Sequence, residues 1–204
     1  LIRRTPSEEE QSRQEETGQR GTARRSERRW LDYDPVIDSS LRRSTALLNA
    51  IEAALVAPDQ LRLVYQPRVD LASNRCVAVE ALLRWTHPTL GEISPAEFIP
   101  LAETTASIRN ITRWVVRHVC EQLAQWRGQG LEITTSLNVS ALDLTDGLLF
   151  DELVAAMHEF DVAPQHVELE FTESVLVTDF QLVHVQLQRF RDLGVAIGID
   201  DFGS

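Results

Sequence analysis

The sequence contains no lysine, because all 20 of its basic side chains are arginine. No reaction that needs a lysine amine can therefore use a side chain of these 204 residues. Cysteine is scarce as well, since Cys76 and Cys120 are the only two and neither belongs to a Cys-x-x-Cys or Cys/His pattern. This spacing argues against a disulfide framework and against a zinc site. We expect both thiols to be buried.

Long apolar runs and a positive net charge are also missing. No stretch approaches the ~20 apolar residues that a membrane-spanning helix needs, and the Arg- and Glu-rich start lacks the apolar centre of a signal peptide. The formal net charge of −11 argues against a nonspecific nucleic-acid surface, which has to neutralise phosphates. We therefore expect a cytoplasmic protein with no membrane contact from this segment and no nucleic acid polymer as its partner.

Hydrophobic residues make up 43% of the chain, enough for a core, but they are unevenly distributed. Residues 1–29 contain eight Arg and six Glu and only three apolar side chains. This composition cannot offset the entropy lost on ordering, so we expect a disordered or linker tail there. Residues 30–59 carry leucine and isoleucine at helical spacing and are predicted to form a linker helix region. Residues 60–204 are predicted to form the main domain.

Hydrophobic patterns after residue 60 predict strands and helices in a regular order. The stretches “LRLVYQPRVDL” and “CVAVEALLRW” are typical of the two strands of a hairpin. A short helix at “PAEFIPLAE” and a long helix at “SIRNITRWVVRHVCEQLAQWR” follow. From there, strands and helices alternate to the last residue. Such alternation is typical of a parallel sheet wrapped by helices, an α/β fold.

Polar residues follow the apolar part of four predicted strands, and they are Glu80, Asn138, Glu170 and Asp200. From Asn138 to Glu170 and from Glu170 to Asp200 the chain advances by 32 and 30 residues, close to the ~30 residues of one βαβ unit. In a closed βα barrel the carboxyl ends of all strands meet on one face. We therefore expect each of these residues at the end of its strand, and all four side chains together.

The chemistry of this set is that of a hard-oxygen ligand site. Three carboxylates and an amide oxygen, with no His or Cys among them, suit Mg²⁺ or Mn²⁺ better than zinc or copper. The sequence therefore predicts a divalent metal site. Each residue taken singly is also explained as an ordinary strand-end polar group or as a helix N-cap.

Five short motifs occur in order along residues 61–204: “YQP”, “EALLRW”, “NVS”, “EFTES” and “IDDFGS”. On these motifs, and on “HPTLGEISPAEFIPLAE” between them, the chain resembles the EAL domain family, named for the Glu-Ala-Leu at residues 80–82. The resemblance implies an α/β fold, a TIM-like (β/α) barrel of the EAL type. It also implies an enzyme, a phosphodiesterase that hydrolyses cyclic di-GMP to linear pGpG.

The resemblance further implies a role for each matching residue. Asp201 would serve a second metal ion and the attacking water, and Glu173 would anchor the loop that begins at Asp201. Gln66 and Arg84 would contact the dinucleotide, and the forked guanidinium of Arg84 suits a phosphate. Two ions, Mg²⁺ or Mn²⁺, would stabilise the attacking and leaving oxygens. The implied metal ligands are Glu80, Asn138, Glu170, Asp200 and Asp201, and the implied catalytic residues are Glu80, Asp201 and Glu173.

The resemblance also implies neighbouring segments and partners. The family continues past “DDFGS” into strands that carry a catalytic lysine and another metal-binding glutamate. We therefore expect this chain to lack the last βα units of the barrel and to be catalytically deficient alone. The helix before residue 60 resembles the linker of GGDEF-EAL proteins of bacterial second-messenger signalling, which implies an upstream GGDEF or sensory domain. An EAL homodimer is implied too, and nothing in the sequence tests it.

Two other functions stay open beside the phosphodiesterase. A noncatalytic receptor or regulatory EAL domain would bind cyclic di-GMP through Gln66 and Arg84 without converting it. A protein-interaction scaffold would bind no nucleotide at all. The unaltered metal positions favour the enzyme.

Overall fold

The chain divides into two compact units, residues 1–43 and 44–204, and the sheet with its covering helices lies in the second. The computed structural model describes residues 35–105, 107–145, 147–172 and 180–200. In sequence order the elements are α2 (Pro35–Val56), β1 (Leu61–Asp70), β2 (Arg75–His87), β3 (Gly91–Ile93), α3 (Pro95–Glu103), α4 (Ser107–Gly128), β4 (Thr134–Asn138), the 3₁₀ helix η2 (Ala141–Leu144), α5 (Leu148–Phe160), the 3₁₀ helix η3 (Pro164–His166), β5 (Val167–Thr172), α6 (Phe180–Leu193) and β6 (Ala196–Asp200).

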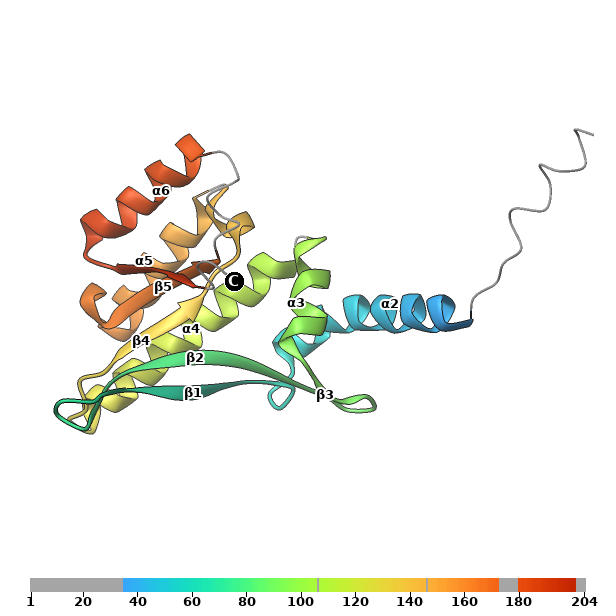
Figure 1. Cartoon of the computed structure of the whole chain (residues 1–204), viewed down its shortest axis with the longest axis horizontal. Coiled ribbons are helices and arrows are strands. Elements are labelled where there is room, and N and C mark those ends of the chain that lie inside the picture. The colour runs from blue at the N-terminus through green and yellow to red at the C-terminus, as the bar shows by residue number, and fades with distance from the viewer. Residues whose placement is uncertain (1–34, 106, 146, 173–179, 201–204) are drawn as a thin grey trace, which may run out of the picture. The chain divides into compact units, whose positions relative to one another are not determined.

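A six-stranded sheet forms the centre of residues 44–204 and follows the order β1-β2-β4-β5-β6, with β3 paired to β2 (Figure 1). β1 and β2 form an antiparallel hairpin, whereas β2, β4, β5 and β6 are parallel neighbours. Parallel neighbours need a crossover connection, and α4, α5 and α6 provide the connections to β4, β5 and β6. The prediction of a hairpin followed by a helix-wrapped parallel sheet is confirmed.

Apolar side chains on the helix-facing side of the sheet form the core. Leu137 on β4 and Val167 and Leu169 on β5 are fully buried, in one cluster with the apolar face of α4. Trp85 on β2 and Phe98 on α3 are also buried and meet edge to face, with ring centroids 5.2 Å apart. Each such side chain stabilises the fold by roughly 1.5–3 kcal/mol. The core therefore holds the parallel strands in place from one side.

The second half of α2 belongs to this core. Leu47, Ile51 and Ala54 are buried at helical spacing and join the same cluster. The helix ends at Val56, shortly before Pro58, because a proline disfavours helical backbone in the residue that precedes it. The predicted division into residues 1–29, 30–59 and 60–204 stays a prediction. Neither α2 nor any other helix in the described part of the chain is long and apolar enough to cross a membrane.

The expectation that Glu80 ends its strand is wrong, because β2 continues for seven more residues, to His87. The strand is long because its antiparallel pairing with β1 extends to Trp85 and because the short strand β3, which we had not expected, pairs with its end. The parallel pairing of β2 with β4 stops at Ala81. Glu80 therefore lies at the carboxyl end of the parallel part of the sheet, although it lies inside its own strand.

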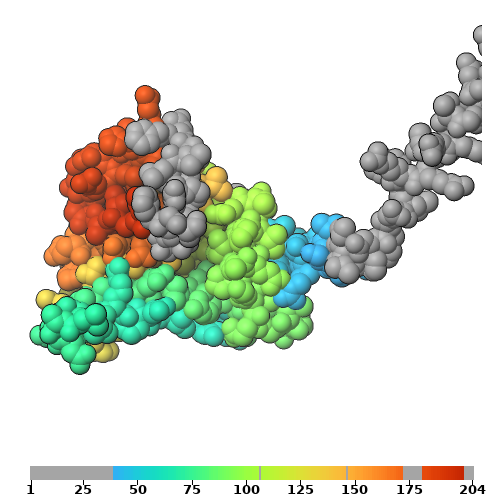
Figure 2. Space-filling view, viewed as in Figure 1, coloured from blue at the N-terminus to red at the C-terminus, as the bar shows by residue number. Residues whose placement is uncertain are grey.

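The expectation of two buried thiols is right for Cys120 and wrong for Cys76. Cys120 lies on the buried face of α4, and burial raises the pKa of its thiol to about 12. Cys76 is exposed because the first residues of β2, next to the hairpin turn, are not covered by a helix. The hairpin lies at the surface of the molecule, in teal at the lower left of Figure 2.

Candidate functional site

Three neighbouring strands bring Glu80, Asn138 and Glu170 to one face of the sheet. Asn138 on β4 is the register partner of Glu170 on β5, and Glu80 on β2 pairs with Ser136, two residues before Asn138. Because side chains alternate along a strand, all three point to the face opposite the helix-packed core. The Nδ2 atom of Asn138 donates a hydrogen bond of 2.8 Å to Oε1 of Glu80. We call this side of the sheet the inner face.

The hydrogen bond between Asn138 and Glu80 also decides which atom Asn138 offers to a ligand. An amide that donates through its nitrogen still presents its oxygen as an acceptor. The inner face therefore offers the Asn138 carbonyl oxygen together with the carboxylates of Glu80 and Glu170. These are hard oxygen donors, the kind that Mg²⁺ and Mn²⁺ prefer. The described residues thus fit a divalent ion by donor chemistry.

Glu170 lies in a partly buried and charged environment. Its side chain is 13% exposed. Burial raises the pKa of its carboxyl above the ordinary value and the negative charge of Glu80 adds to this, while the nearby Ser136 hydroxyl and, more weakly, Arg68 act against it. A carboxylate in such a place gains from a nearby cation, because burial disfavours the charged form. Glu170 is therefore a strong candidate for a cation ligand.

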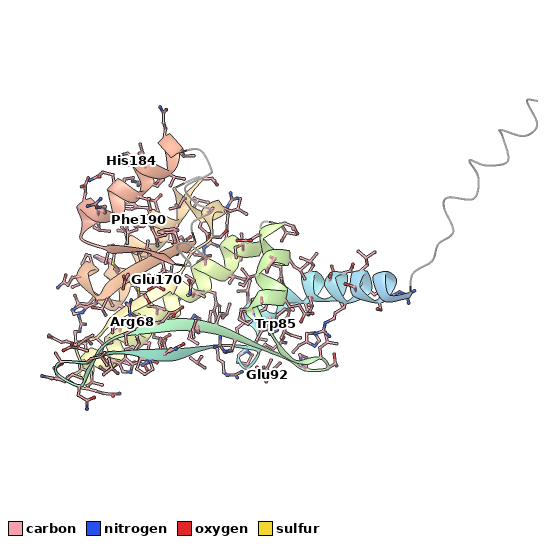
Figure 3. The ribbon with its side chains drawn as sticks, viewed as in Figure 1. Arg68, Trp85, Glu92, Glu170, His184 and Phe190 are labelled. Atoms are coloured by element: carbon pink, nitrogen blue, oxygen red, sulfur yellow. The ribbon has the colours of Figure 1, made fainter. Side chains whose placement is uncertain are left out.

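Arg68 on β1 supplies a cation to the inner face. Its guanidinium pairs with Glu168 through Nη2 and with Glu170 through Nη1, the second at 3.3 Å. Figure 3 labels Arg68 and Glu170, which lie close together in the view. Neither Arg68 nor Glu168 was among the sequence-predicted site residues. The available signal was the two-residue period, because Arg68 follows the candidate Gln66 by two residues on the same strand.

Gly198 on β6 leaves the room that the two glutamates occupy. It is the register partner of Glu170, and Ala196 is the partner of Glu168. A Cβ atom at position 198 would lie 3.2 Å from Cγ of Glu170 and 3.3 Å from Oε1 of Glu168, closer than most Cβ contacts. Any larger residue here would require the two glutamates to move by a few tenths of an ångström. Gly198 was not among the sequence-predicted site residues.

A groove of about 790 Å³ opens beside the oxygen cluster. Asn138, Glu170 and Arg84 contribute polar atoms to it, and the walls include Leu82 and Ile99. Ligand pockets commonly have ~300–1,000 Å³ and combine apolar walls with a few polar groups. The groove is therefore large enough for a nucleotide-sized ligand with its reacting group at the oxygen cluster.

Two sequence-predicted nucleotide contacts lie near this groove. Gln66 on β1 is the register partner of Glu80 and is exposed. Arg84 on β2 lines the groove, and its Nη1 donates to the Leu83 carbonyl at 2.9 Å. An arginine has five N–H donors, so this bond leaves donors for an anionic ligand. Glu103 at the end of α3 also lines the groove and accepts a hydrogen bond of 2.7 Å from the Ser140 hydroxyl. Neither of these two residues was predicted from the sequence as part of the site.

The remaining predicted site residues are only partly described. The backbone of Asp200 ends β6 as predicted, next to Thr172 of β5, while Glu173 and Asp201 lie outside the described residues. In the part of the chain that the structure describes, no three His, Cys, Asp or Glu side chains gather closely enough to hold a metal ion. The described donors are two carboxylates and one amide.

Comparisons with known proteins agree with this geometry. The sequence matches the family profile “EAL domain” over residues 46–204. The protein “Cyclic di-GMP phosphodiesterase PA2567” of Pseudomonas aeruginosa is 45% identical over 175 residues, 86% of this chain and 30% of that protein. The “Oxygen sensor protein DosP” of Escherichia coli is 35% identical over 176 residues, 86% of this chain and 22% of that protein. The solved structure “PaMucR Phosphodiesterase, c-di-GMP complex” has a TM-score of 0.73 and 39% identity, covering 78% of this chain and 64% of that chain.

The chain therefore belongs to the EAL domain family, and its fold is the TIM-like (β/α) barrel fold of the EAL type. The family and the fold class that the sequence motifs predicted are confirmed. The chain spans less than a third of the length of the two curated relatives named above.

Proposed function

We propose that this site hydrolyses cyclic di-GMP to linear pGpG. The observation that carries the proposal is the oxygen cluster of Glu80, Asn138 and Glu170 beside the groove. Two relatives support it by name: PA2567 is called a cyclic di-GMP phosphodiesterase, and PaMucR is described as a phosphodiesterase in complex with c-di-GMP. Both the pocket and the family thus favour a phosphodiester substrate.

Divalent metal ions are the cofactors of phosphodiesterases in this family. We propose two ions, Mg²⁺ or Mn²⁺, held by the five predicted ligands. When bound, such ions neutralise negative charge on a reacting phosphodiester and activate water. The donor chemistry of the three described ligands supports this choice, because hard oxygens favour these ions. The five proposed ligands are Glu80, Asn138, Glu170, Asp200 and Asp201.

The protein's own side chains have separate proposed roles. Asn138 holds the Glu80 carboxylate by its Nδ2 donor and keeps that group oriented. Arg84 and Gln66 bind the dinucleotide, with the Arg84 fork directed at a phosphate. Glu173 anchors the loop that begins at Asp201, after β6, and Asp201 serves the second ion and the attacking water. The apolar groove walls, which include Leu82 and Ile99, would contact the apolar parts of the ligand.

Partners and compartment are part of the same proposal. The relative MucR of Pseudomonas aeruginosa is named a bifunctional diguanylate cyclase and cyclic di-GMP phosphodiesterase. We propose an upstream GGDEF or sensory domain, an EAL homodimer and a cytoplasmic location for the protein, as the sequence motifs implied.

Incubation of the purified protein with cyclic di-GMP and Mg²⁺ or Mn²⁺ tests the proposal, with pGpG followed by chromatography and nucleotide binding by calorimetry. We expect the full-length protein to convert cyclic di-GMP until a chelator removes the metal, and residues 1–204 alone to be catalytically deficient. The Glu170→Gln variant should lose conversion, whereas the control Glu92→Gln, on β3 and bonded to Thr86, should retain it. Nucleotide that stays bound and unconverted with metal present would identify a receptor. A lack of nucleotide binding would leave only the scaffold function.

A further inference from the structure

Arg68 contacts carboxylates that lie three strands away in the sheet. It belongs to β1, at one edge, while Glu168 and Glu170 belong to β5. Neighbouring strands lie ~4.8 Å apart, so three steps across a flat sheet would amount to about 14 Å. The side chain of Arg68 nevertheless reaches β5, since its guanidinium pairs with both Glu168 and Glu170, and Figure 3 labels Arg68 beside Glu170. The contact therefore depends on the tertiary arrangement of the sheet and not on one local hairpin.

The charges that surround this guanidinium are the carboxylates of the proposed active site. Arg68 is hydrogen-bonded to Glu168, and the charges of Glu170 and Glu80 also act on it. The side chains of Glu168 and Glu170 are only 21% and 13% exposed, whereas that of Arg68 is 42% exposed. Partly buried like charges repel one another, and a cation among them relieves the repulsion. Arg68 thus supplies at the inner face a positive charge of the kind that a metal ion would supply.

The two ion pairs of Arg68 are not equivalent. The hydrogen bond to Glu168 is the main interaction of the guanidinium, whereas the Nη1 atom lies 3.3 Å from Oε1 of Glu170, longer than the ~2.7–2.9 Å of a charge-assisted hydrogen bond. Arg68 is therefore anchored on Glu168, which is not among the proposed metal ligands. It can release Glu170 and remain paired.

We propose that Arg68 is a positioning residue that holds Glu170 before metal binding and competes with the divalent ion for that carboxylate. The proposal rests on the proposed function, because it needs Glu170 to be a metal ligand. Arg68 orients Glu170 and offsets negative charge while the ion is absent. When an ion binds, Arg68 stays on Glu168, and its positive charge opposes the ion. Arg68 therefore sets the metal concentration at which the site fills.

Calorimetric titration of the purified protein with Mg²⁺ and with Mn²⁺ tests this inference. We expect Arg68→Gln to bind the ions roughly tenfold more tightly than the wild type, equivalent to about 1.4 kcal/mol. Arg68→Lys, which keeps the charge, should bind within about threefold of the wild type. Arg62→Gln is the matched control, because Arg62 lies on the same strand and forms an exposed pair with Glu92. It should leave metal affinity unchanged.

Thermal unfolding supplies a readout that does not depend on catalysis. Without metal, Arg68→Gln should unfold at a lower temperature than the wild type, because its carboxylates have lost their cation. Added Mn²⁺ should raise the unfolding temperature of this variant by more than that of the wild type, since tighter binding to the native state stabilises it more.

A double-mutant cycle with Glu168→Gln keeps the inference testable if one variant folds poorly. Glu168→Gln should weaken metal binding, because Arg68 loses its anchor and pairs with Glu170 alone. The same change made in the Arg68→Gln background should weaken binding less, and the difference measures the coupling.

The possible results separate this inference from the proposed function. If the wild type binds neither ion, both the proposed metal site and the proposed role of Arg68 are wrong. If the wild type binds the ions but Arg68→Gln binds them equally or more weakly, Arg68 does not compete for Glu170, while the proposed function is untouched. Tighter binding by Arg68→Gln together with normal binding by Arg68→Lys supports the inference.

Discussion

The two faces of the parallel sheet are built from neighbouring residues of the same strands, yet they differ in the charge that they carry. On β4 and β5 the helix-facing side carries Leu137 and Leu169, both fully buried in the apolar core. The inner face carries Asn138, Glu168 and Glu170, with carboxylates that are mostly shielded from water. One face gains stability by burial, and the other bears the cost of partly buried charge. A fold keeps such charge where function needs it.

The comparison teaches that substitutions on the two faces should affect different measurements. Changes on the helix-facing side should lower stability and leave metal binding alone. Changes on the inner face should lower activity or metal affinity with a smaller effect on stability.

The largest effect is expected at Glu80, on the inner face. Glu80→Gln keeps an oxygen that accepts the Asn138 hydrogen bond but removes the negative charge that a dication needs. We expect cyclic di-GMP hydrolysis to fall by roughly 10²–10³-fold, as when one electrostatic group is removed from an active site. Initial rates with saturating Mn²⁺ measure this, and the unfolding temperature serves as control. Retention of near-normal activity would show that the inner face is not the catalytic face.

Leu137→Ala tests the helix-facing side of the same strand. Leu137 is fully buried, so its truncation should cost about 2–5 kcal/mol through lost burial and a residual cavity. Urea unfolding gives the value, and metal affinity of the folded protein should not change. Leu71→Ala is the matched control, because Leu71 is 94% exposed at the hairpin turn and its truncation should barely affect stability. Equal losses at both positions would contradict the assignment of the core.

Gly198→Ala tests whether the inner face depends on the space that β6 leaves for Glu168 and Glu170. The added Cβ would force Glu170 and Glu168 to move by a few tenths of an ångström, and such a misplacement should lower the hydrolysis rate by about tenfold. Gly128→Ala is the control, because no atom lies within 4 Å of a Cβ added there. Steady-state rates of cyclic di-GMP hydrolysis measure this effect. A rate equal to that of Gly128→Ala would mean that the site tolerates the displacement of the two glutamates.

The smallest effect is expected at Arg117, which forms an ion pair far from the inner face. Arg117 on α4 pairs with Glu159 on α5 through two hydrogen bonds, and both side chains are about half exposed. Exposed pairs contribute little because water and salt screen them. Arg117→Gln should therefore leave the unfolding temperature and the rate close to those of the wild type. A loss as large as that of Leu137→Ala would show that exposure is a poor guide to the role of these Arg–Glu pairs.

Much of the candidate site was predictable, because it depends on short-range patterns. The two-residue period places Asn138 and Glu170 at the same face, and the βα repeat makes them neighbours. The exact strand length was not predictable, since β2 runs beyond Glu80 only through pairing with β1 and β3. The strand propensity of a short segment does not show which other strands it pairs with. The exposure of Cys76 was missed for the same reason, because it depends on which part of the hairpin a helix covers.

The sequence by itself determined the order of the main strands and helices apart from β3, the alternation of apolar and polar faces, and membership of the EAL family, since all three depend on local patterns and motifs. Only the tertiary structure decided which inner-face residues meet. The pairing of Arg68 with Glu168 and Glu170, across 100 and 102 residues of chain, and the space that Gly198 leaves for those glutamates both depend on the curl and register of the whole sheet. Contacts between strands that are not adjacent depend on that geometry, and local sequence patterns do not predict it.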